Sequence, residues 1–178
     1  YIVVWKSWGQ GSGVFGQRYD SSGATIGAEF QISSTTHNSP VITALSDGGF
    51  VVAWQNSTQI SGQRYDGSGA TVGSESVFAT VVDNISSITA LNNGGFFIVW
   101  ERGGSGVLGQ QFDNTNAKIG PAFIINTLTG GDQKQPSVAT LTNGDFVVTW
   151  QDSGTRCVQA QLFDSSGNAL GDEFQVNT

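Results

Sequence analysis

Charged residues are scarce in this chain. They make up 12% of its 178 residues, about half the share that soluble proteins usually carry. Lys and Arg number 7 against 14 Asp and Glu, which gives a net charge of −7 at neutral pH. A nucleic-acid-binding surface needs clustered Lys and Arg to neutralise phosphates. The composition therefore argues against nucleic acid as a partner.

Cysteine, methionine and long apolar runs are nearly or wholly absent. The one cysteine, Cys157, rules out a disulfide within the chain. We expect it to be a buried small hydrophobe, in the place of Phe15 or an Ile60-like residue in other copies of the repeat described below. No stretch approaches roughly 18 apolar residues, so no membrane span is predicted. Because the chain starts at Tyr1 and has no methionine, we expect it to be processed or a piece of a longer protein.

Catalytic groups are also rare. The only histidine, His37, stands in a Ser/Thr/Asn run and is predicted to be a solvated loop residue. The Gly-x-Ser-x-Gly motif of serine hydrolases is missing. Glu29, Glu75 and Glu173 recur at one repeat position, where the third copy has Ala122, and this pattern is more typical of a solvated sheet-edge charge than of a catalytic pair. We therefore predict that the chain is not an enzyme.

What the chain does contain is a short phrase repeated four times after a tryptophan. The phrase reads Gly/Ala-Gln-x-aromatic-Asp and occupies Gly16–Asp20, Gly62–Asp66, Gly109–Asp113 and Ala160–Asp164; the tryptophans are Trp5, Trp54, Trp100 and Trp150. The spacing corresponds to a unit of roughly 45–50 residues. We expect one domain over residues 1–178, divided into an incomplete repeat 1–36 and repeats 37–82, 83–130 and 131–178.

The fourth copy shows the predicted strands most fully. Ser137–Leu141 and Phe146–Trp150 flank an Asn-Gly turn, as in a β-hairpin. Val158–Asp164 and Glu173–Val176 form a second hairpin. Each repeat is thus predicted to be a four-stranded antiparallel meander.

The second strand of each repeat indicates how the sheets pack. Phe50–Trp54 and Phe96–Trp100 are apolar on both faces, whereas a strand with one wet face alternates apolar and polar residues. In a repeat protein the neighbouring repeat is the natural cover. The sequence therefore predicts an all-β fold, a β-propeller-like array of four such meanders. A β-sandwich is the competing architecture, but it does not require fourfold self-similarity.

The repeated phrase itself reads as structural. The glutamine in each copy is predicted to be a half-buried amide that ties a loop or the next repeat by hydrogen bonds; ligand contact is the alternative. The aspartate begins a turn in which Gly, three residues later, takes positive φ, with Asn116 in that place in the third copy. A weak Ca²⁺ site built from the aspartate and loop carbonyls is the alternative.

At this point the residues resemble a known repeat. The motifs at Gly48–Gln55, Gln63–Gly69 and Gly171–Thr178 are similar to a repeat of very large secreted bacterial proteins that serve as adhesins or surface structures. The resemblance covers essentially the whole chain. It implies an extracellular or cell-surface location and a structural or adhesive role. The calcium-binding nonapeptide of such proteins is absent except for the fragment Gly130–Asp132, and we expect no cofactor.

Candidate contact residues lie where the repeats differ most, in the loops between the second and third strands and between successive repeats. Variable loops on a fixed scaffold are where recognition usually resides. The candidates for contact with a ligand or partner are Trp8, Asn56, Arg102 and Arg156. Asn56 and Asn84 also match the N-glycosylation pattern.

The first copy lacks its first strand. It begins at Tyr1–Trp5, already the second strand of the repeat, so Tyr1, Val3 and Trp5 form a predicted assembly edge open to pairing. Either a longer chain supplies the missing strand, or another subunit supplies a strand and copies join head to tail into a filament. The leading hypothesis is a non-enzymatic extracellular structural or adhesive module whose partners are copies or repeats of itself. The alternative is a lectin-like propeller that binds glycans through its loops.

Overall fold

The computed structural model describes residues 1–178 except 10, 35–37, 57, 81–84 and 104–105. The described residues form fifteen β-strands and no helix. The strands are β1 (Ile2–Ser7), β2 (Gly13–Tyr19), β3 (Thr25–Ser33), β4 (Asn38–Ala44), β5 (Phe50–Gln55), β6 (Ile60–Tyr65), β7 (Thr71–Ala79), β8 (Ile85–Ala90), β9 (Phe96–Arg102), β10 (Gly106–Phe112), β11 (Lys118–Ile124), β12 (Gln133–Thr140), β13 (Phe146–Asp152), β14 (Cys157–Phe163) and β15 (Phe174–Gln175).

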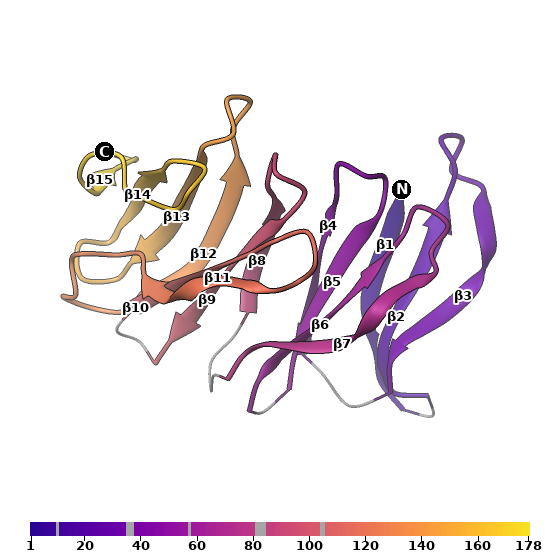
Figure 1. The fold of residues 1–178 in the computed structure, drawn as a ribbon. Coiled ribbons are helices and arrows are strands. Elements are labelled where there is room, and N and C mark those ends of the chain that lie inside the picture. The colour runs from indigo at the N-terminus through magenta and orange to yellow at the C-terminus, as the bar shows by residue number, and fades with distance from the viewer. Residues whose placement is uncertain (10, 35–37, 57, 81–84, 104–105) are drawn as a thin grey trace.

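The strands form four antiparallel meanders, here called blades. The first blade is the three-stranded sheet β1–β2–β3, and the other three have four strands each, β4–β7, β8–β11 and β12–β15. The predicted all-β fold and the missing strand of the first repeat are confirmed. The blades lie in a row from the indigo N-terminal sheet to the yellow C-terminal one (Figure 1). Inner strands β1, β4, β8 and β12 contact in that order, as in a propeller.

Two strands differ from the sequence prediction. β12 begins at Gln133, ahead of Pro136, because Gln133 and Lys134 already pair with β13 before a bulge interrupts the ladder. The bulge accommodates the proline, which has no N–H to donate. β15 is shorter than predicted, with only Phe174 and Gln175 paired to β14. In the other blades this outer strand has a following blade packed against it.

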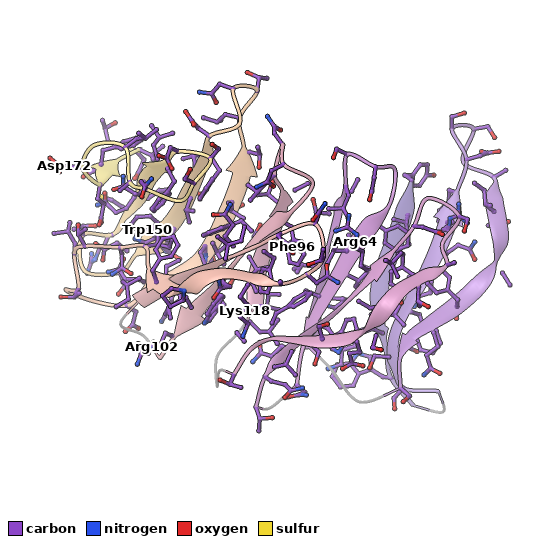
Figure 2. All side chains as sticks on the ribbon, in the orientation of Figure 1. Arg64, Phe96, Arg102, Lys118, Trp150 and Asp172 are labelled. Atoms are coloured by element: carbon purple, nitrogen blue, oxygen red, sulfur yellow. The ribbon has the colours of Figure 1, made fainter. Side chains whose placement is uncertain are left out.

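The core consists of three apolar layers, each between two successive blades. One face of β9, with Phe96, Ile98 and Trp100, packs toward the second blade. The opposite face, with Phe97 and Val99, packs toward the fourth. Figure 2 shows Phe96 between the second and third blades. The doubly apolar strands are therefore covered by neighbouring blades, as the sequence predicts.

The repeated glutamine stabilises a bulge in the outer strand of its own blade. Gln110 Nε2 donates to the carbonyls of Gln111, Ile119 and Gly120 at 3.0, 3.2 and 3.1 Å. Gly120 has φ +67°, and the register between β10 and β11 shifts at this point. Gln63 makes the three equivalent bonds, and Gln17 and Gln161 each make two of them, to the carbonyls of the next residue and of the repeat glycine. The prediction that this amide is buried and hydrogen-bonded is confirmed, and its hydrogen bonds lie within one blade.

The aspartate that ends the phrase organises the turn that follows, as predicted. Asp66 Oδ1 accepts hydrogen bonds from the Ser68 N–H, the Ser68 hydroxyl and the Ala70 N–H. The Ser68 hydroxyl bond is the main reason that the pKa of Asp66 lies below its ordinary value. Gly69, three residues on, has φ +88°, and Asn116 takes its role in the third blade with φ +68°.

Candidate functional site

The fourth blade presents an apolar face with no blade on it. Val158, Phe174 and Val176 are 37%, 45% and 54% exposed. The equivalents of Val158 and most of those of Val176 are buried under the next blade; they are Val14, Ile60 and Val107, and Phe78 and Ile125. The equivalents of Phe174, which are Phe30, Ser76 and Phe123, are half-buried. We call Val158, Phe174 and Val176 the tail face.

The first blade presents the opposite apolar face. Tyr1 and Val3 are 69% and 45% exposed, and Trp5 is half-buried. The equivalents are buried against the preceding blade, namely Phe50, Val52 and Trp54, Phe96, Ile98 and Trp100, and Phe146, Val148 and Trp150. We call Tyr1, Val3, Trp5 and Tyr19 the head face. The structure therefore brings the three predicted edge residues together on one surface.

A recurring aromatic arrangement shows what each face normally contacts. Every blade stacks two rings from its repeat's second and third strands, with centroids 4.7 to 5.2 Å apart; the pairs are Tyr1–Tyr19, Phe50–Tyr65, Phe96–Phe112 and Phe146–Phe163. The preceding blade adds a tilted Phe to each inner pair, namely Phe30 to Tyr65, Phe78 to Phe112 and Phe123 to Phe163. Within the described residues, the Tyr1–Tyr19 pair receives no such ring, and Phe174 has no pair to contact.

The predicted loop residues share one end of the blades but lie on different blades. Trp8 is 76% exposed, and Lys6 Nζ lies 3.6 Å from the centroid of its ring. Asn56 uses its side-chain oxygen to accept the Thr58 and Gln59 N–H groups in its own turn. Arg102 lines a cleft between the second and third blades, and Arg156 lines a separate one on the fourth. The antiparallel topology places these loops at one end, but different blades keep them apart.

The structure contradicts the prediction for Cys157 and does not test those for two other residues. Cys157 was expected to be buried, yet it is half-exposed at the start of β14, where its Sγ donates to the Thr155 carbonyl at 3.3 Å. The repeat register aligns Cys157 with Gly13, Gln59 and Gly106 instead of an apolar position. His37 and the candidate glycosylation residue Asn84 lie outside the described residues.

The recurring glutamate is not uniformly a solvated charge. Glu29 and Glu75 are exposed. Glu173 Oε2, however, reaches the third blade and accepts the Thr127 N–H at 2.7 Å, the Thr127 hydroxyl at 2.9 Å and the Leu128 N–H at 3.2 Å. The sheet-edge prediction is wrong for Glu173, because this edge adjoins a neighbouring blade.

Clefts open between the outer strands of successive blades. One of about 420 Å³ lies between β7 and β10–β11, and its lining includes Thr80, Arg102, Lys118 and Ala122. Another, of about 400 Å³, lies between β11 and β14–β15, and its lining includes Thr127 and Glu173. The sequence analysis did not predict either cleft. The third copy has Ala122 where the other copies have Glu, and this difference lies in the first cleft.

Within the described part of the chain, no three His, Cys, Asp or Glu residues gather as a metal site would require. No helix in that part is long and apolar enough to cross a membrane. The Oδ1 atoms of Asp20, Asp66, Asp113 and Asp164, which were considered for Ca²⁺, accept hydrogen bonds within their own turns.

Comparison with known proteins identifies the fold alone. No model of a known protein family matches the chain, and no curated protein matches it. Among solved structures, a protein of unknown function from Dyadobacter fermentans aligns with a TM-score of 0.65 and 11% identity over 92% of this chain. The Dos1 propeller aligns with a TM-score of 0.56 and 16% identity over 93%. An engineered GH43 glycoside hydrolase with endo-xylanase and exo-arabinofuranosidase activity aligns with a TM-score of 0.54 and 11% identity over 99%.

These alignments cover 58%, 43% and 40% of the three proteins, so the chain spans about half the length of the structures that it resembles. Their shared architecture, with the four meanders described above, establishes that the chain has a β-propeller fold.

Proposed function

We propose that this chain is a non-enzymatic structural module that assembles head to tail with further blades of its own kind. The observation that carries the proposal is the matched pair of exposed faces. The tail face lies at positions that a following blade covers in blades one to three, and the head face lies at positions that blades two to four bury against a preceding blade. Each face therefore fits the other on a second copy.

Contacts between blades within the chain indicate how the head face of one copy would pack on the tail face of another. Phe174 corresponds to Phe123, whose ring tilts onto Phe163 of the next blade with centroids 5.7 Å apart. In the assembly Phe174 would tilt in the same way onto the Tyr1–Tyr19 pair of another copy. Each fully buried Val or Phe side chain contributes about 1.5–3 kcal/mol, so a few of them supply a substantial part of an association free energy.

The contact is heterologous, because head meets tail, and such contacts generate a ring when the rotation closes and a filament when it does not. The inner strands contact in sequence along one side of the row, which favours closure around a propeller axis. A filament is the other form in which the same contact could occur. The resemblance to repeats of bacterial surface proteins supports an extracellular or cell-surface setting with a structural or adhesive role.

Charge placed on either face tests the proposal. Phe174→Glu on the tail face and Val3→Glu on the head face should each reduce self-association, measured by size-exclusion chromatography with light scattering, because burying an unpaired carboxylate is costly. Both residues are exposed in the single chain, so both variants should fold. Ile119→Glu is the matched control, since Ile119 is 42% exposed but lies on the third blade. Equal behaviour of all three variants would refute the head-to-tail contact.

A second candidate is carbohydrate binding at Trp8, a lectin-like role. Its 76% exposure in a variable loop favours this candidate, because exposed aromatic rings offer an apolar face for a partner. Binding on a glycan array at neutral pH, with and without calcium, should be saturable and should be lost in Trp8→Ala. An array on which the wild type binds nothing would leave the structural module as the better account.

A further inference from the structure

The two outer clefts are equivalent places in successive blade pairs, and one of them contains its own carboxylate. Glu173 of the fourth blade extends across the cleft and accepts the N–H and the hydroxyl of Thr127, which follows β11 of the third blade. The chain thereby shows that this position accommodates a carboxylate and supplies the donors for it.

In the cleft between the second and third blades the carboxylate is missing but its donor residue remains. The repeat register places Ala122 where the fourth blade has Glu173, and Thr80 where the third blade has Thr127. Both residues line the cleft of about 420 Å³. Among the described residues, no group takes the place of the Glu173 carboxylate at Thr80. The third repeat therefore leaves vacant the position that the fourth repeat fills.

The same cleft carries two positive charges that the other repeats lack. Arg102 and Lys118 both line it, and Figure 2 labels them at the end of β9 and the start of β11. Their equivalents are neutral or acidic; these are Ser7, Asn56 and Asp152 for Arg102, and Thr25, Thr71 and Ala169 for Lys118. Among the described residues that line the cleft there is no Asp or Glu. Two of the chain's 7 Lys and Arg residues thus line the cleft in which the internal carboxylate is lost.

The rest of the lining is largely apolar, with Phe78, Leu108 and Pro121. A cleft of this size lies within the usual range for small-molecule sites, about 300–1,000 Å³, which combine apolar walls with a few placed polar groups. Arg and Lys beside such a wall favour an anion with an organic body, because charge-assisted hydrogen bonds hold the anion while the wall contacts the body.

From these features we infer that the cleft between β7 and β10–β11 binds a small organic carboxylate, whose carboxylate group takes the place that Glu173 occupies in the next cleft. Thr80 donates to the carboxylate, and Arg102 and Lys118 neutralise it. The site is independent of the head and tail faces, so it goes beyond the structural role proposed above. The body of the ligand is either a sugar, as in a uronic acid, or an apolar group.

The test uses the full chain and three probes, D-glucuronate, 3-phenylpropionate and D-glucose, followed by NMR at the amides of Thr80, Lys118 and Ala122. We expect saturable shifts with at least one carboxylate, with a Kd of about 1 mM or tighter, and none with glucose. Glucuronate binding would identify a sugar acid, and phenylpropionate binding an apolar carboxylate. The absence of saturable shifts with both carboxylates would overturn the inference.

Two variants test the geometry. Ala122→Glu restores the residue found at this position in the other three repeats and should abolish binding by occupying the carboxylate position from within. Arg102→Ala combined with Lys118→Ala should weaken binding by at least about tenfold. Lys134→Ala is the control, because Lys134 pairs with Asp132 at 2.7 Å elsewhere on the surface and should leave binding unchanged. Binding that survives Ala122→Glu would place the ligand elsewhere and refute the proposed site.

Discussion

At the scale of single residues, each position of the repeated phrase has a distinct structural role. The aromatic stacks in the layer between blades, the glutamine satisfies carbonyls freed by a bulge, and the aspartate closes the turn. In the third blade these residues are Phe112, Gln110 and Asp113. The glutamine role follows from burial, since a buried carbonyl without a donor costs free energy. The phrase therefore serves the scaffold in every blade.

Gln110→Ala should destabilise the chain. Gln110 is 2% exposed, and its loss leaves three buried or half-buried carbonyls without this donor, which should lower the free energy of unfolding by about 1–3 kcal/mol. Urea unfolding followed by tryptophan fluorescence measures the change. Gln175→Ala, at an exposed glutamine of β15, should have little effect. An equal loss in both variants would show that the bulge contacts contribute nothing specific.

The turn aspartates predict a pH dependence at the acid end. The Thr115 hydroxyl bond, the largest cause, lowers the pKa of Asp113 in the folded chain. A lowered native pKa contributes stability that is fully present above the unfolded value, about 3.9, and is lost as the pH falls through the native pKa. Asp113→Asn keeps the acceptor without titrating, so its urea midpoint should fall less steeply below about pH 4. Identical pH profiles for variant and wild type would contradict this assignment.

At the scale of elements, the sequence predicts the strands and their packing more reliably than their ends. The doubly apolar pattern of Phe96–Trp100 predicted a strand covered on both faces, and both layers are present. The early start of β12 was not predictable from Pro136, because pairing across a bulge depends on the partner strand. The clefts were not predictable either, since their lining comes from residues of two blades that pack only in the folded chain.

One sequence feature of the strands became clear only with the structure. Gly62 of the repeated phrase lies under the ring of Phe78, and a Cβ built on Gly62 would stand 2.0 Å from that ring. The glycine is therefore needed for close approach of β6 and an aromatic side chain of β7. In the fourth blade, Ala160 takes the position, and the equivalent of Phe78 is the smaller, exposed Val176.

Phenylalanines on the outer strands should differ in energetic importance between an inner blade and the fourth blade. Phe78→Ala should lower the free energy of unfolding by about 3–5 kcal/mol, because Phe78 is 1% exposed and contacts Phe96 and Phe112. Phe174→Ala should cost much less in dilute solution, since its side chain is 45% exposed. Urea unfolding at low protein concentration measures both. Comparable losses would show that the fourth blade is already covered.

At the scale of the whole molecule, the chain is an arc of blades with an apolar face at each end. The predicted edge at Tyr1, Val3 and Trp5 is part of the head face. The tail face was not predicted, because Val158, Phe174 and Val176 are apolar, as are most of their equivalents in the covered blades. They differ in lying on the fourth blade, whose outer face contacts no other described blade. The contact proposed between copies therefore resembles the contact between successive blades within one chain.

The mass of the wild-type chain in solution tests the head-to-tail account most directly. Sedimentation equilibrium over a wide range of concentrations should show association of the 18.7 kDa chain into a ring of defined stoichiometry or a growing polymer, with the assembled fraction rising with concentration. Either form uses the same contact between the two faces. A mass of 18.7 kDa at every concentration would contradict the account.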